Sequence, residues 1–330
     1  KAKAQTDAPR LASSKEEIAD AQAAQGLHTL AWQEGWTAYN GKVYAYKESC
    51  VNLLLLGVDK RGKLQKETDF SNWLAGQTDA VFLLSLDTED KKASLIAIPR
   101  NAMVNLEIYG KDGNIEDFMY NALCLQYPYA GGGEFGLQKT AQRVSELFYG
   151  LPIHGVCAVG FEAVGAAADI IGGVEVTIID DMHGLGAKYR VGDTVTLTGK
   201  NALAYLRGRD DNIDGSPTVR LTRQKEFLKA LAGKLLQEPS ALPGLAANLY
   251  QTITPYMVTD VTLDETVYLA KQLSACRMDG GSFYQLTGEN VRATNDFGVS
   301  FDDFYLDEAA IKDVAVSVFY EEVVLTETAP

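Results

Sequence analysis

The chain has 330 residues, 46% of them hydrophobic, and carries a formal net charge of −14 at pH 7. A chain of this length and composition can bury one large core. General binding to nucleic acid or to an anionic membrane surface depends on clustered Lys and Arg, so the acidic balance argues against both. An anionic ligand would therefore need a local basic site.

The start of the chain is predicted to be a stalk followed by a small β-hairpin. Residues 1–36 are rich in Ala, Gln, Lys and Glu, with few large apolar side chains, so we expect them to be partly disordered. Residues 37–46 place Asn40-Gly41 between alternating aromatic positions, which predicts a hairpin. No run of about 18 uncharged apolar residues occurs in the sequence, so no membrane-spanning segment is predicted within it.

The remaining chain alternates between strand and helix patterns. Short apolar runs bounded by polar residues or glycine predict buried strands at 51–58, 80–87, 93–98, 156–159, 174–179 and 283–286. Apolar residues at helical spacing predict helices at 137–149, 161–171, 200–206, 218–237, 263–275 and 306–319. This alternation predicts an α/β fold, a three-layer α/β/α sandwich around a mixed central sheet. We expect a main domain over 37–238, with helices and a strand of 239–330 packed on it or appended to it.

The cysteines and histidines do not indicate a metal or nucleophile site. Cys50, Cys124, Cys157 and Cys276 are widely spaced without a C-x-x-C motif, and the three histidines are scattered, which argues against zinc and against a Cys/His nucleophile. The cysteines are either small buried hydrophobes or, in an exported protein, disulfide partners. For the exported case we predict a disulfide between Cys124 and Cys157, which stand on either side of the helix 137–149.

Charged residues stand where predicted strands and helices begin or end. The acids are Asp59, after the first long strand, and Asp79, before the next. The arginines at such positions are Arg61, Arg100, Arg207, Arg209, Arg220 and Arg223. Gln224 shares a helix face with Arg220 and Arg223. Each arginine alone could be an ordinary surface residue.

Together these residue types suit a pyrophosphate–metal site. Two carboxylates without histidine suit Mg²⁺, which takes the rest of its shell from water and phosphates. Guanidinium groups match phosphate oxygens in bidentate fashion and stay charged. Phosphoryl transfer depends mainly on positioning and charge, so no protein nucleophile is required. The run Gly131-Gly132-Gly133 is either a phosphate loop, although it lacks the Walker spacing, or a plain loop before a helix.

From about Asn52 to Leu236 the sequence resembles the LytR-CpsA-Psr family. The resemblance is carried by seven segments in order: LLLGVDKR, TDAVFLLSLD, SLIAIPRNAMV, YNAL, GFEAVGAAADIIGGVEVTI, LTGKNALAYLRGRD and VRLTRQKEFLKAL. No single segment is specific, but their order and spacing together are. The segments before and after this range match only loosely.

The resemblance implies a phosphotransferase of cell-wall biogenesis. Such an enzyme moves a glycopolymer, for example teichoic acid or capsule polysaccharide, from a polyprenyl-pyrophosphate lipid carrier to peptidoglycan. It uses Mg²⁺ or Mn²⁺, and 37–238 would be its catalytic domain. The resemblance also implies an extracytoplasmic protein of a Gram-positive-type bacterium, anchored to the cell membrane by an N-terminal helix outside this sequence.

The resemblance assigns roles to individual residues. Asp59 and Asp79 would hold the metal. The catalytic phosphate contacts would be Arg61, Arg100, Arg207, Arg209, Arg220 and Gln224. Arg223 would bind substrate or only complete the helix face, and Asn121 would bind substrate. A hydrophobic tunnel for the prenyl chain is expected beside the phosphate site, and its wall, or simply ordinary core, is expected at Val104, Leu106, Phe118 and Leu123.

Two positions depart from the family pattern. Asn101 stands where an Asp usually follows the Pro-Arg pair, and Met119 stands where a Lys usually precedes the YNAL segment. These departures keep two alternatives open. One is a non-catalytic module that binds or senses lipid phosphate, and the other is a polyprenyl-pyrophosphate pyrophosphatase.

Overall fold

The computed structural model describes Leu11, Glu17 and residues 19–21, 35–71, 75–180, 189–208, 216–294, 298 and 300–323. Most of the predicted stalk, together with Arg209, lies outside the described residues. Within the described part of the chain, no helix is both long enough and apolar enough to span a bilayer.

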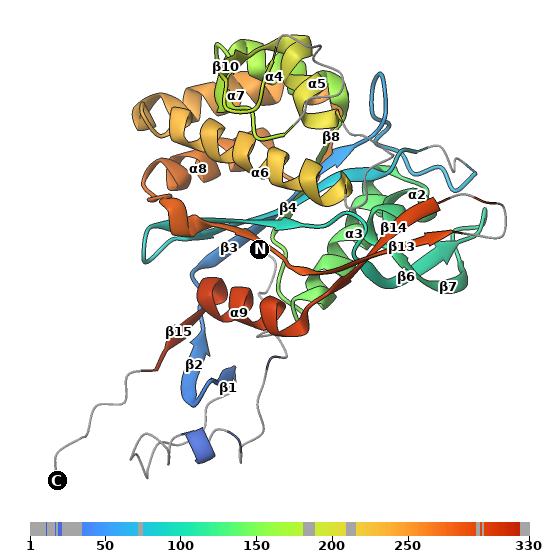
Figure 1. Ribbon diagram of the computed structural model, residues 1–330, viewed down its shortest axis with the longest axis vertical. Helices are drawn as coiled ribbons and strands as arrows, with labels where there is room; N and C mark the ends of the chain where they lie inside the picture. The colour runs from blue at the N-terminus through green and yellow to red at the C-terminus, as the bar shows by residue number, and fades with distance from the viewer. Residues whose placement is uncertain are drawn as a thin grey trace.

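A six-stranded mixed sheet forms the centre of the molecule (Figure 1). Its strands, in spatial order, are β11 (Met257–Thr259), β8 (Gly155–Val159), β3 (Cys50–Val58), β4 (Thr78–Asp87), β5 (Lys92–Ile98) and β12 (Phe283–Gln285). β3, β4 and β5 form an antiparallel meander, while β8 runs parallel to β3 and β12 parallel to β5. The predicted mixed sheet is confirmed.

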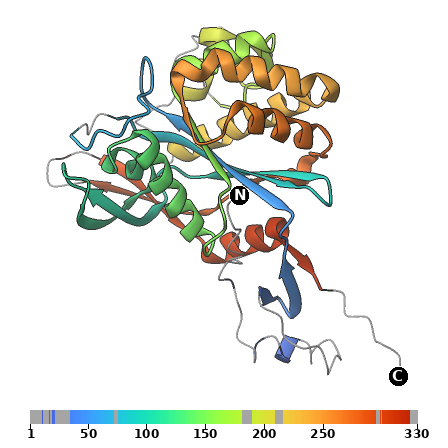
Figure 2. The ribbon, with the colours of Figure 1, turned by 180° about the vertical axis from the view of Figure 1, so that it is seen from behind.

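Helices cover both faces of this sheet, which confirms the three-layer prediction (Figures 1 and 2). One layer contains α3 (Gly133–Leu147) and α9 (Glu308–Phe319). The other contains α4 (Phe161–Ile170), α5 (Gly199–Arg207), α6 (Ser216–Leu235), α7 (Leu242–Ile253) and α8 (Leu263–Ser274). Short helical segments connect them: η1 (Leu123–Leu125), α2 (Gln126–Tyr129), η2 (Pro239–Ala241), η3 (Thr254–Tyr256) and η4 (Gly280–Ser282).

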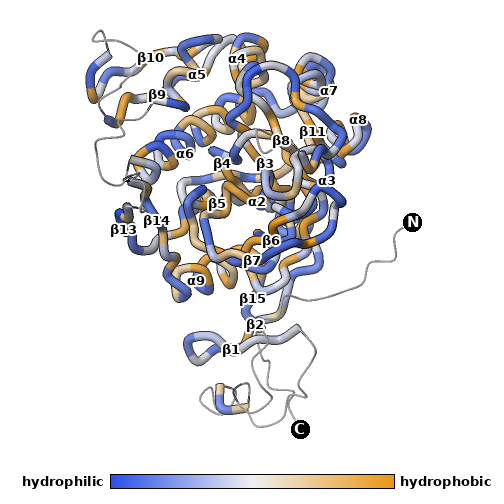
Figure 3. Tube along the Cα trace, turned by 90° about the vertical axis from the view of Figure 1, so that its right-hand side faces the viewer, coloured by the Kyte–Doolittle hydropathy of each residue, from blue (hydrophilic) through white to orange (hydrophobic). Residues whose placement is uncertain are grey.

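The central strands are buried on both faces because each face meets a helical layer. Leu54 and Leu56 of β3 pack in the cluster that contains α3 and α9. Phe82 and Leu95, on β4 and β5, pack against Leu221 of α6 on the other face. The middle of the sheet therefore carries hydrophobic colours in Figure 3, as continuous apolar strand sequences predict.

The N-terminal hairpin forms as predicted. β1 (Trp36–Tyr39) pairs with β2 (Lys42–Tyr46), and both turn residues have positive φ, 48° at Asn40 and 74° at Gly41. A two-residue turn with positive φ at both positions matches the right-handed twist of the two strands that it joins. Asn and Gly adopt positive φ at low cost. The last described strand, β15 (Tyr320–Glu322), adds to the other edge of β2, so segments from both ends of the chain share one small sheet.

Three further strand pairs lie outside the central sheet. They are β6 (Met103–Tyr109) with β7 (Ile115–Ala122), β9 (Val174–Thr177) with β10 (Thr194–Leu197), and β13 (Gly288–Thr294) with β14 (Ser300–Leu306). Of these strands, only β9 is predicted from the sequence. Most β7 residues are exposed, so this strand lacks the apolar run or alternation that predicts buried strands.

The residues after 238 supply both edges of the central sheet. β11 pairs with β8, and β12 pairs with β5. The segments before and after this position therefore build one sheet and one core.

The cysteine prediction needs correction, because the structure has all four cysteines as free thiols. Cys124 lies in η1, where its sulfur is 3.8 Å from Gln77 Oε1, whereas Cys157 lies within β8 and pairs in register with Leu55 and Thr259. The strand holds Cys157 within the sheet, away from η1, so the predicted disulfide does not form here.

The glycine run is a plain loop that enters α3. The N–H groups of Gly131, Gly132 and Glu134 donate to backbone carbonyls within 3.0 Å, and that of Gly133 donates to the Tyr127 hydroxyl. These donors are thus used within the protein and do not form a phosphate cradle.

Candidate pyrophosphate site

The topology of the sheet brings the charged segments together at one end. β3 ends where β4 begins, since Val58 pairs with Thr78, and β5 ends there too, since Val81 pairs with Ile98. Asp59, Asp79 and Arg100 follow or open these strands. An antiparallel meander therefore places side chains that are distant in sequence at one rim.

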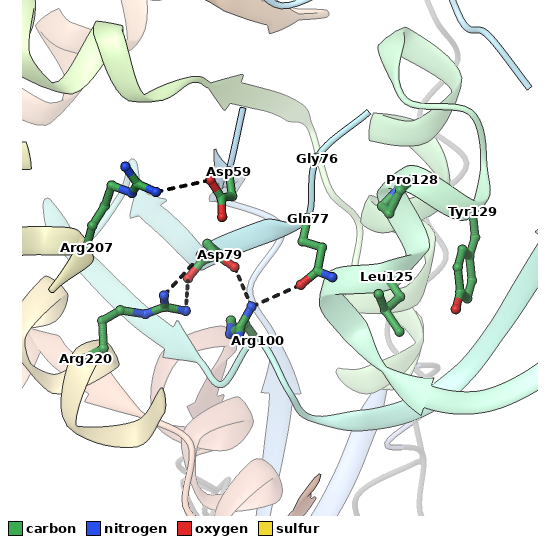
Figure 4. A pocket seen from close by; sticks show the side chains of 10 residues that line it. All are labelled: Asp59, Gly76, Gln77, Asp79, Arg100, Leu125, Pro128, Tyr129, Arg207 and Arg220. Carbon is green, nitrogen blue, oxygen red and sulfur yellow. Dashed lines mark hydrogen bonds and ion pairs between the residues drawn. The ribbon is translucent and has the colours of Figure 1, made fainter. Parts of the chain in front are cut away.

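These residues line a cavity of about 610 Å³, here called the arginine pocket (Figure 4). Its lining is Asp59, Gly76, Gln77, Asp79, Arg100, Leu125, Pro128, Tyr129, Arg207 and Arg220. The arginines come from the end of β5, the end of α5 and the first turns of α6. The pocket thus concentrates positive charge within an acidic protein.

Asp79 stands between two arginines. Arg220 Nη1 donates to Asp79 Oδ2 at 3.0 Å, and Arg100 Nη1 donates to Oδ1 of the same carboxylate (Figure 4). Arg100 also donates to Gln77 Oε1 at 3.2 Å. The Asp79 side chain is only 14% exposed and that of Arg220 only 5%, so these charges are fixed in position before any ligand arrives.

A looser pair stands at the mouth of the pocket. Arg207 Nη2 lies 3.5 Å from Asp59 Oδ1, and their side chains are 39% and 45% exposed. An ion pair this exposed is weak and can reopen when a more highly charged ligand binds.

Arg223 and Gln224 position the end of α5 from the neighbouring helix α6. Arg223 donates to the carbonyls of Tyr205 and Gly208 at 2.7 and 2.6 Å, and it forms a buried ion pair with Asp180. Gln224 Nε2 donates to the Leu206 carbonyl at 3.2 Å. The helix ends at Arg207, and these side chains satisfy its last carbonyls.

Nearby charges and burial set the protonation of the pocket. Burial alone would lower the pKa of Arg100, but the nearby carboxylates of Asp79 and Asp59 raise it, so the guanidinium stays charged. Burial raises the pKa of the Cys124 thiol to about 11, so this cysteine is protonated at neutral pH. The pocket therefore offers fixed charge and no thiolate nucleophile.

An apolar cavity of about 390 Å³ adjoins the arginine pocket and shares Asp79, Arg207 and Arg220 with it. It lies between the sheet and the layer of α4, α5, α6 and α7, and Gln224 is its other polar residue. Small residues leave this space open, namely Gly57, Ala80, Gly160, Ala163, Ala167 and Ala168. The arrangement suits a ligand with an anionic head and an apolar tail.

Comparison with known proteins identifies the family. The sequence model of the LytR_cpsA_psr family matches residues 12–312. The chain belongs to the LytR_cpsA_psr family.

Known proteins similar to this chain match it at low sequence identity. A polyisoprenyl-teichoic acid--peptidoglycan teichoic acid transferase TagU of Oceanobacillus iheyensis is 28% identical over 235 residues, which are 70% of this chain and 66% of that protein. The TagU of Bacillus mycoides is 24% identical over 270 residues, 81% of this chain and 77% of that protein. A solved structure described as TagT bound to LI-WTA has a TM-score of 0.59 at 23% identity, covering 82% of this chain and 90% of that one, which shows the fold.

The family-based site residues do not all meet in the arginine pocket. Asp59, Asp79, Arg100, Arg207 and Arg220 line it. Gln224 lines the adjoining apolar cavity instead, and Arg223 is turned toward Asp180 and the end of α5. Arg61 is exposed and absent from the lining, Arg209 lies outside the described residues, and Asn121 lines a third cavity beyond Arg100.

None of the four residues expected as tunnel wall or as ordinary core lines the apolar cavity. Leu123 is fully buried in the main core, and Val104 packs against that core. Leu106 is also fully buried. Phe118 is 67% exposed on β7. These residues follow the Pro-Arg segment in the sequence, but the helices that line the cavity are α4, α5, α6 and α7, and no residue of β6 or β7 lines it.

The sequence patterns did not predict the other residues that line the arginine pocket. Gln77 accepts from Arg100, and Gly76 has a φ of 98° with no room for a Cβ, which would lie 2.8 Å from Val58 Cγ1. A Gly-Gln pair two residues before the predicted metal ligand Asp79 was the available signal. No local pattern in the sequence marks Leu125, Pro128 and Tyr129. These residues reach the pocket only because η1 and α2 pack beside it.

In this LytR_cpsA_psr chain, the carboxylates of Asp59 and Asp79 suit a hard cation that takes its remaining ligands from water and phosphate. Asp59 and Asp79 both line the pocket, whereas the described residues contain no group of three or more His, Cys, Asp or Glu side chains placed to hold a metal. Mg²⁺ commonly takes one or two carboxylates and completes its shell from water and phosphate oxygens.

Proposed function

We propose that this protein transfers a glycopolymer from a polyprenyl-pyrophosphate carrier to peptidoglycan. The observation that carries the proposal is the arginine pocket opening beside the apolar cavity, with Asp79, Arg207 and Arg220 common to both. The pyrophosphate would lie among the arginines and the first prenyl units between the sheet and α4. Each methylene buried there contributes about 0.8 kcal/mol.

The arrangement supports transfer by positioning and charge. Arg100 and Arg220 are held by Asp79 before the donor binds, so their guanidinium groups need no reorganisation to meet the pyrophosphate oxygens. The pair of Arg207 with Asp59 is long and exposed, so a phosphate group could displace Asp59 from it. A wall-sugar hydroxyl would attack the phosphorus next to the glycopolymer, and polyprenyl phosphate would leave.

The proposal includes a divalent cation, Mg²⁺ or Mn²⁺, with Asp59 and Asp79 as its protein ligands. Such a cation would neutralise charge on the pyrophosphate. Asp59 is the more available ligand, because both oxygens of Asp79 already accept from arginines.

The polymer and the place of action follow from the donor. The relatives named teichoic acid transferases favour teichoic acid as the glycopolymer, with capsule polysaccharide as the other polymer to test. A donor with its prenyl chain in the bilayer and a wall acceptor favours an extracytoplasmic protein held at the cell membrane by an N-terminal helix.

The decisive experiment offers radiolabelled lipid-linked polymer to the protein with and without peptidoglycan. Label that becomes attached to peptidoglycan is the expected result. Release of free polymer phosphate without attachment would instead identify a pyrophosphatase, and binding without turnover a non-catalytic module. Chelation of divalent cations is expected to abolish transfer, and Mg²⁺ or Mn²⁺ to restore it.

A variant in the apolar cavity tests the prenyl assignment separately. Ala167→Phe places a ring in the cavity and is expected to raise KM about tenfold or more for a long-chain donor, with little effect for a two-isoprene analogue. Ala309→Phe, at an exposed position of α9, is the matched control. The assignment would be contradicted if Ala167→Phe had the same KM as the control for the long-chain donor as well as for the analogue.

A further inference from the structure

A third cavity adjoins the arginine pocket at Arg100 and shares no lining residue with the apolar cavity. It measures about 510 Å³ and is here called the hairpin cavity, because β13 and β14 form one wall. It shares Gln77, Arg100 and Leu125 with the arginine pocket. Its other lining residues are Asn101, Asn121, Ala122, Cys124, Pro217, Arg292, Ser300, Phe301, Asp302 and Asp303. A ligand in it could therefore reach a phosphate held by Arg100.

The lining of the hairpin cavity suits a sugar. Amide, carboxylate and guanidinium groups stand beside the Phe301 ring, which is partly exposed. A sugar presents hydroxyls at its edges and C–H groups on its faces, and polar groups beside an aromatic ring match both. The apolar cavity, in contrast, is lined almost entirely by apolar side chains.

Asp303 is distinct among the acids that line these cavities. Asp79 is paired with two arginines, Asp59 with Arg207, and Asp302 with Arg292 at 3.7 Å. Within the described part of the chain, the half-buried Asp303 carboxylate has no hydrogen-bond or ion-pair partner. It is thus the acid whose oxygens are available to a ligand.

Resting on the function proposed above, we infer that the hairpin cavity receives the acceptor sugar and that Asp303 accepts the proton of its attacking hydroxyl. The hydroxyl oxygen forms a bond to the phosphorus next to the glycopolymer. The bond between that phosphorus and the bridging oxygen breaks, and the bridging oxygen leaves with the electron pair as part of polyprenyl phosphate. The proton passes to Asp303 and from there to solvent.

The surroundings of Asp303 strengthen it as a base. Burial, and then the charge of Asp302, raise the pKa of Asp303, whereas a carboxylate held by arginines is a weaker base. The other titratable or charged groups that line the cavity are Arg100, Arg292, Cys124 and Asp302. Burial raises the pKa of the Cys124 thiol to about 11, so this thiol is protonated at neutral pH and the base in this cavity is a carboxylate.

The test compares Asp303→Asn with wild type in the transfer assay across pH. We expect transfer to fall about 10²- to 10⁴-fold, as for loss of a general base, and the acid limb of the kcat/KM profile to disappear. Binding of the lipid-linked donor, measured without peptidoglycan, is expected to stay unchanged. Asp303→Glu keeps a carboxylate and is expected to retain the acid limb at a reduced rate. Glu289→Gln, on the exposed strand β13, is the control for charge removal on the hairpin.

The outcomes separate this inference from the function on which it rests. If the wild type transfers polymer and Asp303→Asn does so at the full rate with an unchanged acid limb, the role of Asp303 is overturned. The proposed function then still stands. An acid limb that is lost in Asp302→Asn but kept in Asp303→Asn would overturn it by assigning the base to Asp302. A wild type that transfers no polymer to peptidoglycan would reject the proposed function, and this inference with it.

Discussion

At the scale of single residues, the arginines of the pocket differ in how much the fold depends on them. Arg220 is buried against Asp79, whereas Arg207 is partly exposed against Asp59. Removal of one partner from a buried pair leaves an uncompensated charge, but removal from an exposed pair costs little. We therefore expect the guanidinium group of Arg220 to serve both stability and ligand binding, and that of Arg207 to serve mainly ligand binding.

We expect Arg207→Ala to lower transfer about 10²- to 10³-fold with an unchanged melting temperature, as for loss of one preorganised charge contact. Arg220→Ala should lose transfer and also stability, by a few kcal/mol, because Asp79 loses a partner. Arg220→Lys should restore stability better than transfer, since an ammonium lacks the planar fork. The matched control is Arg277→Ala at an exposed position after α8. Full activity in both alanine variants would contradict the site assignment.

Asp87 provides a pH-dependent contribution to stability. Burial alone would raise its pKa, but hydrogen bonds from Lys47, the Asp90 amide and Ser49 lower it to about 2. Because the folded pKa lies below the unfolded one, this carboxylate stabilises the protein above about pH 4, and the contribution is lost as the pH falls toward 2.

Asp87→Asn is therefore expected to lower the free energy of unfolding by about 2 kcal/mol at neutral pH. The difference from wild type should shrink between pH 4 and pH 2, as measured by urea unfolding across pH. Asp90→Asn is the matched control, because Asp90 pairs with the same Lys47 but is mostly exposed, and it should change stability by less than about 1 kcal/mol. A constant difference across this range would contradict the assignment.

At the scale of elements, Asn101 explains one departure from the family pattern. Its Nδ2 donates to the Asp302 carbonyl at 2.7 Å, and its own carbonyl accepts from the Phe304 amide at 3.0 Å. An aspartate could not donate to that carbonyl. Asn101 thus ties β14 to the segment that carries Arg100. Met119, the other departure, lies on the exposed strand β7, and nothing in the structure explains it.

We predict that Asn101→Asp loosens β14, because a carboxylate would face a carbonyl oxygen in a buried position. The expected cost is about 1–3 kcal/mol of stability. Amide exchange at Phe304 should accelerate, and transfer should fall with it. Asn105→Asp, on β6, is a same-charge control. An Asn101→Asp protein with wild-type stability and protection at Phe304 would disprove the tie.

At the scale of the whole molecule, the chain after 238 completes the sheet. Both edge strands, β11 and β12, and the wall of the hairpin cavity come from it. A protein ending at residue 238 would expose β8 and β5 as edges and lose α9 from one layer. We expect such a protein not to unfold cooperatively, as measured by calorimetry and near-UV circular dichroism. A truncated protein with a sharp melting transition would show that residues up to 238 fold on their own.

The sequence by itself determined the layers and half of the site. Strands buried on both faces are continuous apolar runs, so 51–58, 80–87 and 93–98 were recognisable, and charged residues at their ends were visible beside them. The Asn-Gly turn likewise fixed the N-terminal hairpin locally. The exposed strand β7 and the short strand β11 left no such pattern, because their positions depend on partners rather than on their own composition.

Only the tertiary structure decided which charges meet and where the apolar cavity lies. The meander brings Asp59, Asp79 and Arg100 to one rim of the sheet. Arg61 is exposed instead, and Arg223, on α6, pairs with Asp180. Small residues of α4 and the sheet, rather than the large apolar residues after Arg100, opened the cavity, since space remains where side chains are too small to fill it. Such contacts depend on how distant segments pack, which no local pattern in the sequence encodes.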